Sequence, residues 1–332
     1  MANIPGSGGR CGPSNGPQCA DCLGLTRTSP TPPSTPSPSS PSQPPSPRIH
    51  VTPNQTNSQL PHYNNGKLYA IKKTVENSGQ ADVYEGVRVS SDNSRVEVAL
   101  KIFRNEDDRD DCKVELISLF KASGHANVME VLDFFEKPKP CMVMRLVRGG
   151  DLMDYLKKHG ALKVDKDVHV LRGIAMGSEH VHSHGIVHRD MKSPNELLQL
   201  PSMDPVLIDL GIGKLVGSAT ARTIEIKGTS LWMAPEMMTD NLSGRKIDIY
   251  ALGIIMWEIF SGQVTLNEFN FGNIAVFIIQ VCTENKRPSV DVVRRIAGVK
   301  PGHVALIQKC WGKDPDSRPT ATEFLQVLKD CR

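Results

Sequence analysis

The hydrophobic pattern of this chain changes its period near Gly150. Before that glycine, short runs rich in Val, Ile, Leu and Phe are separated by polar residues, which is typical of β-strands. These runs read KLYAIKKTV, ADVYEGVRV, VEVALKIF, VMEVLDFF and CMVMRLV, and one helix-period segment, DCKVELISLFKAS, stands among them. After the glycine, apolar residues recur at steps of three and four, which predicts helices. We therefore expect an α+β fold with a small strand-rich lobe, a larger helical lobe and a ligand cleft between them.

The N-terminal part of the chain has the composition of a disordered tail. Residues 29–48 are nearly all Ser, Thr and Pro, and such a segment cannot bury enough apolar surface to offset its ordering entropy. We expect a tail over residues 1–66 and a folded domain over residues 67–332. The tail holds Ser-Pro and Thr-Pro steps and a P-x-x-P spacing at Pro41 and Pro44. It is either a docking segment for SH3-type or proline-directed kinase partners, or a solvated linker.

Charge and hydropathy exclude several classes of protein. The formal net charge of +3 is too small to indicate a nucleic-acid-binding domain. The N-terminus lacks the basic region and apolar run of a signal peptide. The most apolar stretch, residues 247–260, is shorter than the roughly 20 residues that a membrane span needs, and it contains Asp248 and Glu258. We expect a buried core helix there, and a cytoplasmic protein, with access to the nucleus left open, that binds no nucleic acid.

The eight cysteines divide into two groups. Three of them lie in the tail, where Cys19 and Cys22 have the C-x-x-C spacing of a metal knuckle. Since no second pair follows nearby, they form either an incomplete zinc site or incidental thiols. The other five are scattered through the later chain and are expected to be reduced.

Three polar motifs carry the chemistry of the folded part. VALK ends in Lys101, HRDMKSPN contains Asp190, Lys192 and Asn195, and LIDLGIG contains Asp209. Each residue alone is ordinary for a strand, loop or turn. Their order and separations from about residue 67 onward resemble those of eukaryotic protein kinases, of the tyrosine-kinase-like group and serine/threonine type.

The resemblance implies a role for each polar residue in phosphoryl transfer from ATP with Mg²⁺. Lys101 would hold the α- and β-phosphates and would itself be held by Glu115 on the following helix. Asp190 would accept or orient the proton of the attacking hydroxyl, and Lys192 would steady the γ-phosphate. The metal ligands would be Asn195 and Asp209.

The same resemblance implies a nucleotide site between two lobes. The first lobe would span about residues 67–143, the hinge about 144–150 and the second lobe about 151–332. The residues that would contact adenine are Val83 and Ala99 on its faces, Met144 as gatekeeper, and the backbone of Leu146 and Val147. The resemblance also implies a structural pair, Glu236 with Arg318, and a catalytic-loop backbone held by Asp248.

The phosphate-binding loop departs from the family pattern G-x-G-x-x-G-x-V. The best register is ENSGQADV, where Glu76, Ser78 and Ala81 stand at the glycine positions and Gly79 lies between them. Glycine lets a backbone approach phosphates closely, so we expect Ser78 and Gly79 to bind nucleotide more weakly than the family loop does. A second departure is Glu196, at a position where the family prefers an apolar residue.

Two functions therefore stay open. The first is a kinase that phosphorylates serine or threonine in protein substrates, because Lys192 stands two residues after Asp190, as in serine/threonine kinases. The second is a pseudokinase or scaffold that has lost its phosphate loop; a tyrosine-specific kinase is a more distant third. Candidate phosphosites that would regulate the first function are Ser218, Thr220 and Thr223.

Overall fold

The computed structural model describes residues 62–64, 67–77, 81–104, 109–137, 139–161, 163–210, 214–215, 230–239, 244–265 and 274–331. The expected tail, apart from strand residues 62–64, lies outside them, as do Ser78, Gly79 and the three candidate phosphosites. That short strand lies within the segment expected to be disordered, and it pairs with the first residues of the next strand.

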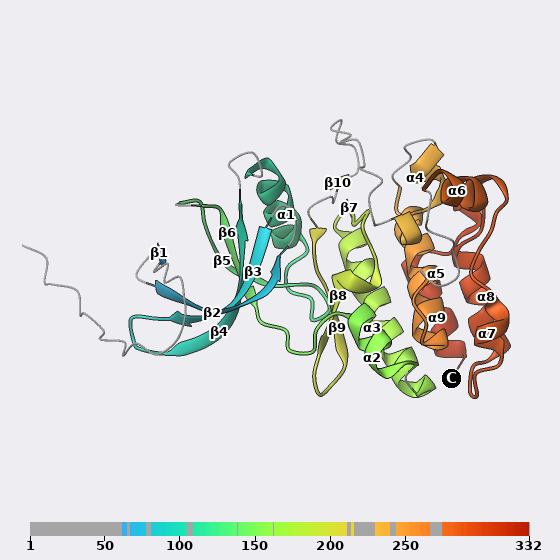
Figure 1. Cartoon of the computed structure of the whole chain (residues 1–332), viewed down its shortest axis with the longest axis horizontal. Coiled ribbons are helices and arrows are strands. Elements are labelled where there is room, and N and C mark those ends of the chain that lie inside the picture. The colour runs from blue at the N-terminus through green and yellow to red at the C-terminus, as the bar shows by residue number, and fades with distance from the viewer. Residues whose placement is uncertain are drawn as a thin grey trace, which may run out of the picture. The chain divides into compact units, whose positions relative to one another are not determined.

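The strands of the first lobe form one antiparallel sheet in the order β1-β2-β3-β4-β6-β5 (Figure 1). One helix, α1, lies against this sheet. The elements of this lobe are β1 (His62–Asn64), β2 (Lys67–Asn77), β3 (Ala81–Val89), β4 (Arg95–Phe103), α1 (Arg109–Lys121), β5 (Val131–Phe135) and β6 (Cys141–Arg145).

The alternation of side chains along β4 divides its residues between two cores. Val98 and Leu100 are fully buried in a small cluster on one side of the sheet. Ala99 and Phe103 belong to the main core on the other side. Lys101 lies between these two in the alternation and therefore points to the same side, toward α1 and the helical lobe.

The second lobe is mostly helical (Figure 1). Its longer helices are α2 (Leu152–His159), α3 (Val164–Ser183), α5 (Lys246–Ser261), α8 (Pro301–Cys310) and α9 (Ala321–Asp330). The shorter ones are α4 (Pro235–Thr239), α6 (Ile274–Ile278), α7 (Val290–Arg294), a π-helix (Ile279–Thr283) and three 3₁₀ turns (Ser193–Asn195, Ser230–Trp232 and Pro315–Ser317). Two small antiparallel pairs complete the lobe, β7 (Ile186–Val187) with β10 (Lys214–Leu215) and β8 (Glu196–Gln199) with β9 (Asp204–Leu207).

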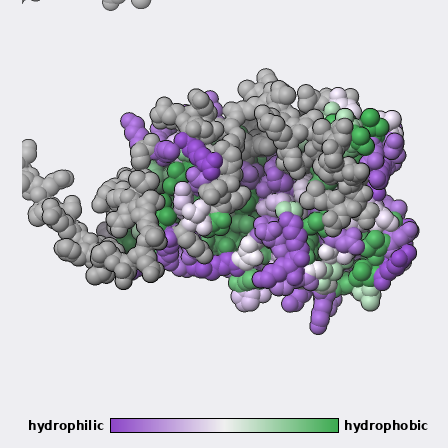
Figure 2. All heavy atoms as spheres, in the orientation of Figure 1, coloured by the Kyte–Doolittle hydropathy of each residue, from purple (hydrophilic) through white to green (hydrophobic). Residues whose placement is uncertain are grey.

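Helix α5 is the centre of this lobe. Every residue from Ile247 to Phe260 is buried, so the expected buried core helix is confirmed. A helix that is buried on all sides has no solvent face, and α5 packs against both α3 and α8. By contrast, the visible residues over α2 and α3 in Figure 2 are mostly hydrophilic, as expected of the outer side of a lobe.

Helix α3 packs unusually closely against its neighbours. A Cβ atom at Gly173 would lie 2.5 Å from Pro205, and one at Gly177 would lie 2.7 Å from the Asn127 carbonyl oxygen. Glycine at both positions lets α3 touch β9 and the segment that precedes β5. The predicted fold class, a strand-rich lobe followed by a helical lobe, is confirmed. Within the described part of the chain, every helix is too short or too polar to cross a bilayer.

Candidate functional site

A buried ion pair joins the sheet to α1. Lys101 Nζ lies 2.7 Å from both carboxylate oxygens of Glu115. Glu115 reaches this position because it shares the inner face of α1 with Cys112 and Leu119, both buried and three or four residues away from it. Burial alone would lower the pKa of Lys101, but attraction to Glu115 and to nearby Asp209 outweighs burial and raises it. Lys101 is therefore a fixed cation.

The segment between β7 and β8 holds a second group of polar side chains. Lys192 Nζ lies 2.7 Å from Asp190 Oδ2, and Asn195 Nδ2 donates to the backbone oxygen of Asp190 at 2.8 Å. Asn195 Nδ2 also lies 3.1 Å from the Asp190 carboxylate. The three side chains are thus fixed relative to one another within six residues of chain.

Asp248 of α5 holds the backbone of this segment, as the sequence led us to expect. Its carboxylate accepts from the N–H groups of His188 and Arg189, both at 2.8 Å. The same carboxylate lies 2.7 Å from His182 Nε2. Burial would raise the pKa of Asp248, but the bonds from His182 and Arg189 lower it, so Asp248 stays ionised. These bonds also offset the cost of the left-handed backbone at Arg189, where φ is 71°.

Asp209 follows β9 and is tied to the same segment. The Ile208 N–H donates to the Asn195 carbonyl at 3.0 Å, and His188 Nε2 lies 3.0 Å from the Ile208 carbonyl. Asp209 Oδ1 thereby comes within 3.4 Å of Lys101 Nζ. His188 is 1% exposed and is therefore a packed core residue.

The two carboxylates of this group differ in acidity. Burial raises the pKa of Asp190 against the attraction of Lys192. Burial acts on Asp209 as well, but attraction to Lys101 outweighs it and lowers the pKa of Asp209. Neighbouring carboxylates whose environments push their pKa values apart suit different chemical tasks, one as a proton acceptor and the other as a permanent anion.

The five apolar residues expected to contact adenine lie together. Ala99 pairs with Met144 across the β4–β6 ladder, and both belong to the main core. Val83 pairs with Lys101 on the neighbouring ladder and packs against that core, as do Leu146 and Val147. The structure thus places this apolar group next to the Lys101–Glu115 pair, while Ser78 and Gly79 lie outside the described residues.

Two residues of the helical lobe were given no role by the sequence. His182 forms a hydrogen bond with the Asp248 carboxylate, and no pattern in the sequence distinguishes it from the other histidines of α3. Glu196 is fully buried, and neither of its carboxylate oxygens has a hydrogen-bond partner among the described residues. Burial raises the pKa of Glu196 well above its usual value.

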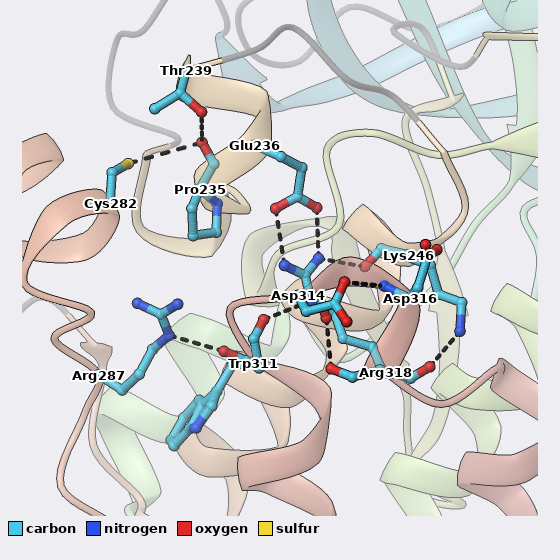
Figure 3. A network of polar contacts seen from close by, with 12 residues as sticks. Pro235, Glu236, Thr239, Lys246, Cys282, Arg287, Trp311, Asp314, Asp316 and Arg318 are labelled. Atoms are coloured by element: carbon cyan, nitrogen blue, oxygen red, sulfur yellow. Dashed lines mark hydrogen bonds and ion pairs between the residues drawn. The ribbon is translucent and has the colours of Figure 1, made fainter.

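The expected structural pair in the helical lobe is confirmed. Arg318 donates to both oxygens of Glu236, at 2.6 and 2.9 Å (Figure 3). Its guanidinium also lies over the ring of Tyr250. Lys246 donates to the Arg318 carbonyl oxygen in the same network. This network joins α4 to α5 and to the turn before α9.

Comparisons with known proteins agree with this geometry. The family model described as "Protein kinase domain" matches residues 64–328. Cyclic GMP-binding protein C of Dictyostelium discoideum is 31% identical over 62% of this chain and 8% of its own length. Serine/threonine-protein kinase STY17 of Arabidopsis thaliana is 26% identical over 79% of this chain and 44% of its own length. Serine/threonine/tyrosine-protein kinase HT1 of the same plant is 28% identical over 70% of this chain and 60% of its own length. This chain therefore spans less than two thirds of each of these relatives.

Proposed function

We propose that this chain, which belongs to the protein kinase family, transfers the γ-phosphoryl group of ATP to serine or threonine hydroxyls of protein substrates. One observation carries the proposal: the sheet, α1 and two segments of the helical lobe bring Lys101, Glu115, Asp190 and Asp209 into one connected group. Phosphoryl transfer asks the protein chiefly for positioning and charge stabilisation, and fixed charges of this kind supply both.

Each side chain has a task that suits its surroundings. Lys101, kept charged by Glu115, is suited to hold the phosphates of ATP. Asp190 has a raised pKa, which favours it as the acceptor that orients the attacking hydroxyl. Lys192, bonded to Asp190, brings a cation to the place where negative charge develops on the transferring group.

The residues present also fit a magnesium ion. Carboxylate and amide oxygens are the hard ligands that Mg²⁺ prefers, and Asp209 has a lowered pKa that keeps it anionic. Asn195 donates its amide nitrogen to Asp190, which leaves its carbonyl oxygen for a metal. When bound there, Mg²⁺ would neutralise charge on the phosphates of ATP.

Serine/threonine specificity, the domain limits and the cellular location are parts of the same proposal. The Lys192 spacing and the name of the relative STY17 support serine or threonine as acceptor, whereas the name of HT1 includes tyrosine as well. The family match over residues 64–328 supports a kinase domain at about 67–332. We propose a cytoplasmic location, and partners of the SH3 or proline-directed kinase type for the tail remain a prediction.

Transfer of labelled phosphate from Mg-ATP by the purified chain, to itself and to a generic basic protein, tests the proposal. We expect label on serine or threonine with the native chain and none with the Asp209→Asn variant. If folded native protein transfers no more label than that variant, the pseudokinase alternative, which rests on the degenerate loop at Ser78 and Gly79, takes its place.

The loop substitution makes a separate prediction about affinity. Replacing Ser78 with glycine restores one glycine of the family pattern, and we expect it to tighten Mg-ATP binding about two- to fivefold. Equilibrium titration with a nonhydrolysable ATP analogue measures the change. Ser91→Gly, in the exposed turn after β3, serves as a control that should leave affinity unchanged. Equal affinity of Ser78→Gly and native protein would show that serine is neutral at this position.

A further inference from the structure

A cavity of about 700 Å³ lies in the helical lobe, and its lining includes none of Lys101, Glu115, Asp190, Lys192, Asn195 and Asp209. Its walls come from the C-terminal part of α3, the first turns of α5 and α9, and the loop before β5. The polar residues that matter most are His125, Glu179, His180, His182, Arg245 and Lys246. The volume falls within the range of small-ligand sites in proteins.

Hydrogen-bond donors outnumber free acceptors in this cavity. Its single carboxylate, Glu179, accepts from the Thr322 hydroxyl through Oε1, which leaves one carboxylate oxygen against the donors of the cavity. Arg245 is exposed and makes no ion pair with any residue that the structure describes. His125 Nδ1 accepts from the Asn127 N–H, so a neutral His125 carries its hydrogen on Nε2 and is a donor. The groups that still need partners therefore call for an acceptor.

The histidine pair adds a buried polar atom to this set. The rings of His125 and His180 stack with centroids 4.7 Å apart. His180 Nε2 is buried and has no hydrogen-bond partner among the described residues. A buried nitrogen without a partner costs free energy, and a ligand that bonds to it would recover that cost.

The cavity also carries net positive charge. Arg245 and Lys246 are two cations against the one carboxylate of Glu179. The Lys246 ammonium donates to a neutral group, the Arg318 carbonyl oxygen (Figure 3), and it also attracts the Glu323 carboxylate of α9, with which it forms no ion pair among the described residues. The N-terminal ends of α5 and α9, which face the cavity, add partial positive charge.

We propose that this cavity is a binding site for a phosphate group. Donors reach it from three different elements, which suits the several oxygens of a phosphate better than the two coplanar oxygens of a carboxylate. A neighbouring cavity of about 330 Å³ shares Met176, Glu179 and Thr322 with it and is lined by Leu325 and Leu328. An apolar side chain beside a phosphorylated residue would fit that second cavity. The phosphate therefore has two possible sources, a phosphorylated peptide and the free ion.

The Asp248 side chain connects the cavity to the segment that carries Asp190. His182 lines the cavity and bonds to Asp248, which holds the backbone of His188 and Arg189 just before Asp190. Binding in the cavity does not depend on phosphoryl transfer. If no phosphate binds in the cavity, the proposed kinase activity is unaffected. If the chain transfers no phosphoryl group, the proposed phosphate site is likewise unaffected.

Calorimetric titration of the full chain tests the proposal. The probes are inorganic phosphate and a phosphoserine peptide flanked by leucines, at ionic strength held constant with sodium chloride. An excess of Mg²⁺ and a nonhydrolysable ATP analogue keeps the proposed nucleotide site filled. We expect saturable binding by native protein, weakened about tenfold or more in Arg245→Gln and in His180→Gln. The matched control is Arg295→Gln, an exposed arginine just after α7 that lines neither cavity, and it should bind as the native chain does.

Each outcome has one meaning. Tighter binding of the phosphopeptide than of inorganic phosphate, with the unphosphorylated peptide inactive, assigns the source to a phosphorylated chain. Equal affinity assigns the source to the free ion. Absence of saturable binding, or equal binding by native protein, Arg245→Gln and His180→Gln, overturns the proposal. Thermal unfolding of each variant checks that a loss of binding is not a loss of fold.

Discussion

Replacing Asp190 with asparagine should lower kcat about 10³-fold while leaving the affinity for Mg-ATP nearly unchanged. Asparagine keeps the size of the side chain, and its amide can still lie near Lys192, so the segment should keep its shape. What disappears is the carboxylate that accepts or orients the proton of the attacking hydroxyl. Steady-state transfer of labelled phosphate gives kcat, and titration with a nonhydrolysable ATP analogue gives the affinity.

The separation of rate from affinity distinguishes Asp190 from its neighbours. Lys101→Met should abolish transfer and weaken nucleotide binding together, because that cation is assigned to the phosphates themselves. Near-native kcat in Asp190→Asn would contradict the role given to this residue. An equal loss of affinity in both variants would show that Asp190 acts by holding the site together.

The two lobes could be predicted because local patterns dictate them. Alternating side chains predicted a strand at β4, and the steps of four and three residues between Cys112, Leu116 and Leu119 predicted a helix at α1, with Glu115 beside its apolar positions. Both patterns describe neighbours along the chain. Tight packing between elements that are distant in the sequence produces a weaker sequence pattern. The close approach of α3 to β9 at Gly173 is therefore seen only in the three-dimensional structure.

The candidate site shows the same limit. The motifs indicated which residues would gather, but the acidity of Asp190 and Asp209 depends on burial and on cations brought from other elements. His182 could not be singled out, because its partner Asp248 lies 66 residues away. Glu196 was recognised as a departure from the family, yet only the structure shows that it is buried without a partner.

Replacing Glu196 with leucine should stabilise the fold by roughly 1–3 kcal/mol at neutral pH. A carboxyl group without hydrogen bonds in an apolar interior either loses its hydration as an ion or takes up a proton in order to fold, and both are costly. Leucine has a similar volume and removes the polar group. Chemical denaturation of the native chain and of Glu196→Leu, followed by tryptophan fluorescence, measures the difference in free energy of unfolding.

The pH dependence of that difference identifies its cause. Because the pKa of Glu196 is raised in the folded state, the native chain is most favoured below the unfolded pKa of about 4.3 and loses stability as the pH rises toward the raised value. The advantage of Glu196→Leu should therefore grow by up to about 1.4 kcal/mol per pH unit over that window, and Glu196→Gln should lack this slope.

Glu258 is the matched control: it is equally buried but accepts hydrogen bonds from Trp232 and Thr265, so Glu258→Leu should destabilise the fold. A stabilising Glu258→Leu, or a Glu196→Leu variant no more stable than the native chain, would show that burial without a partner is not what makes Glu196 costly.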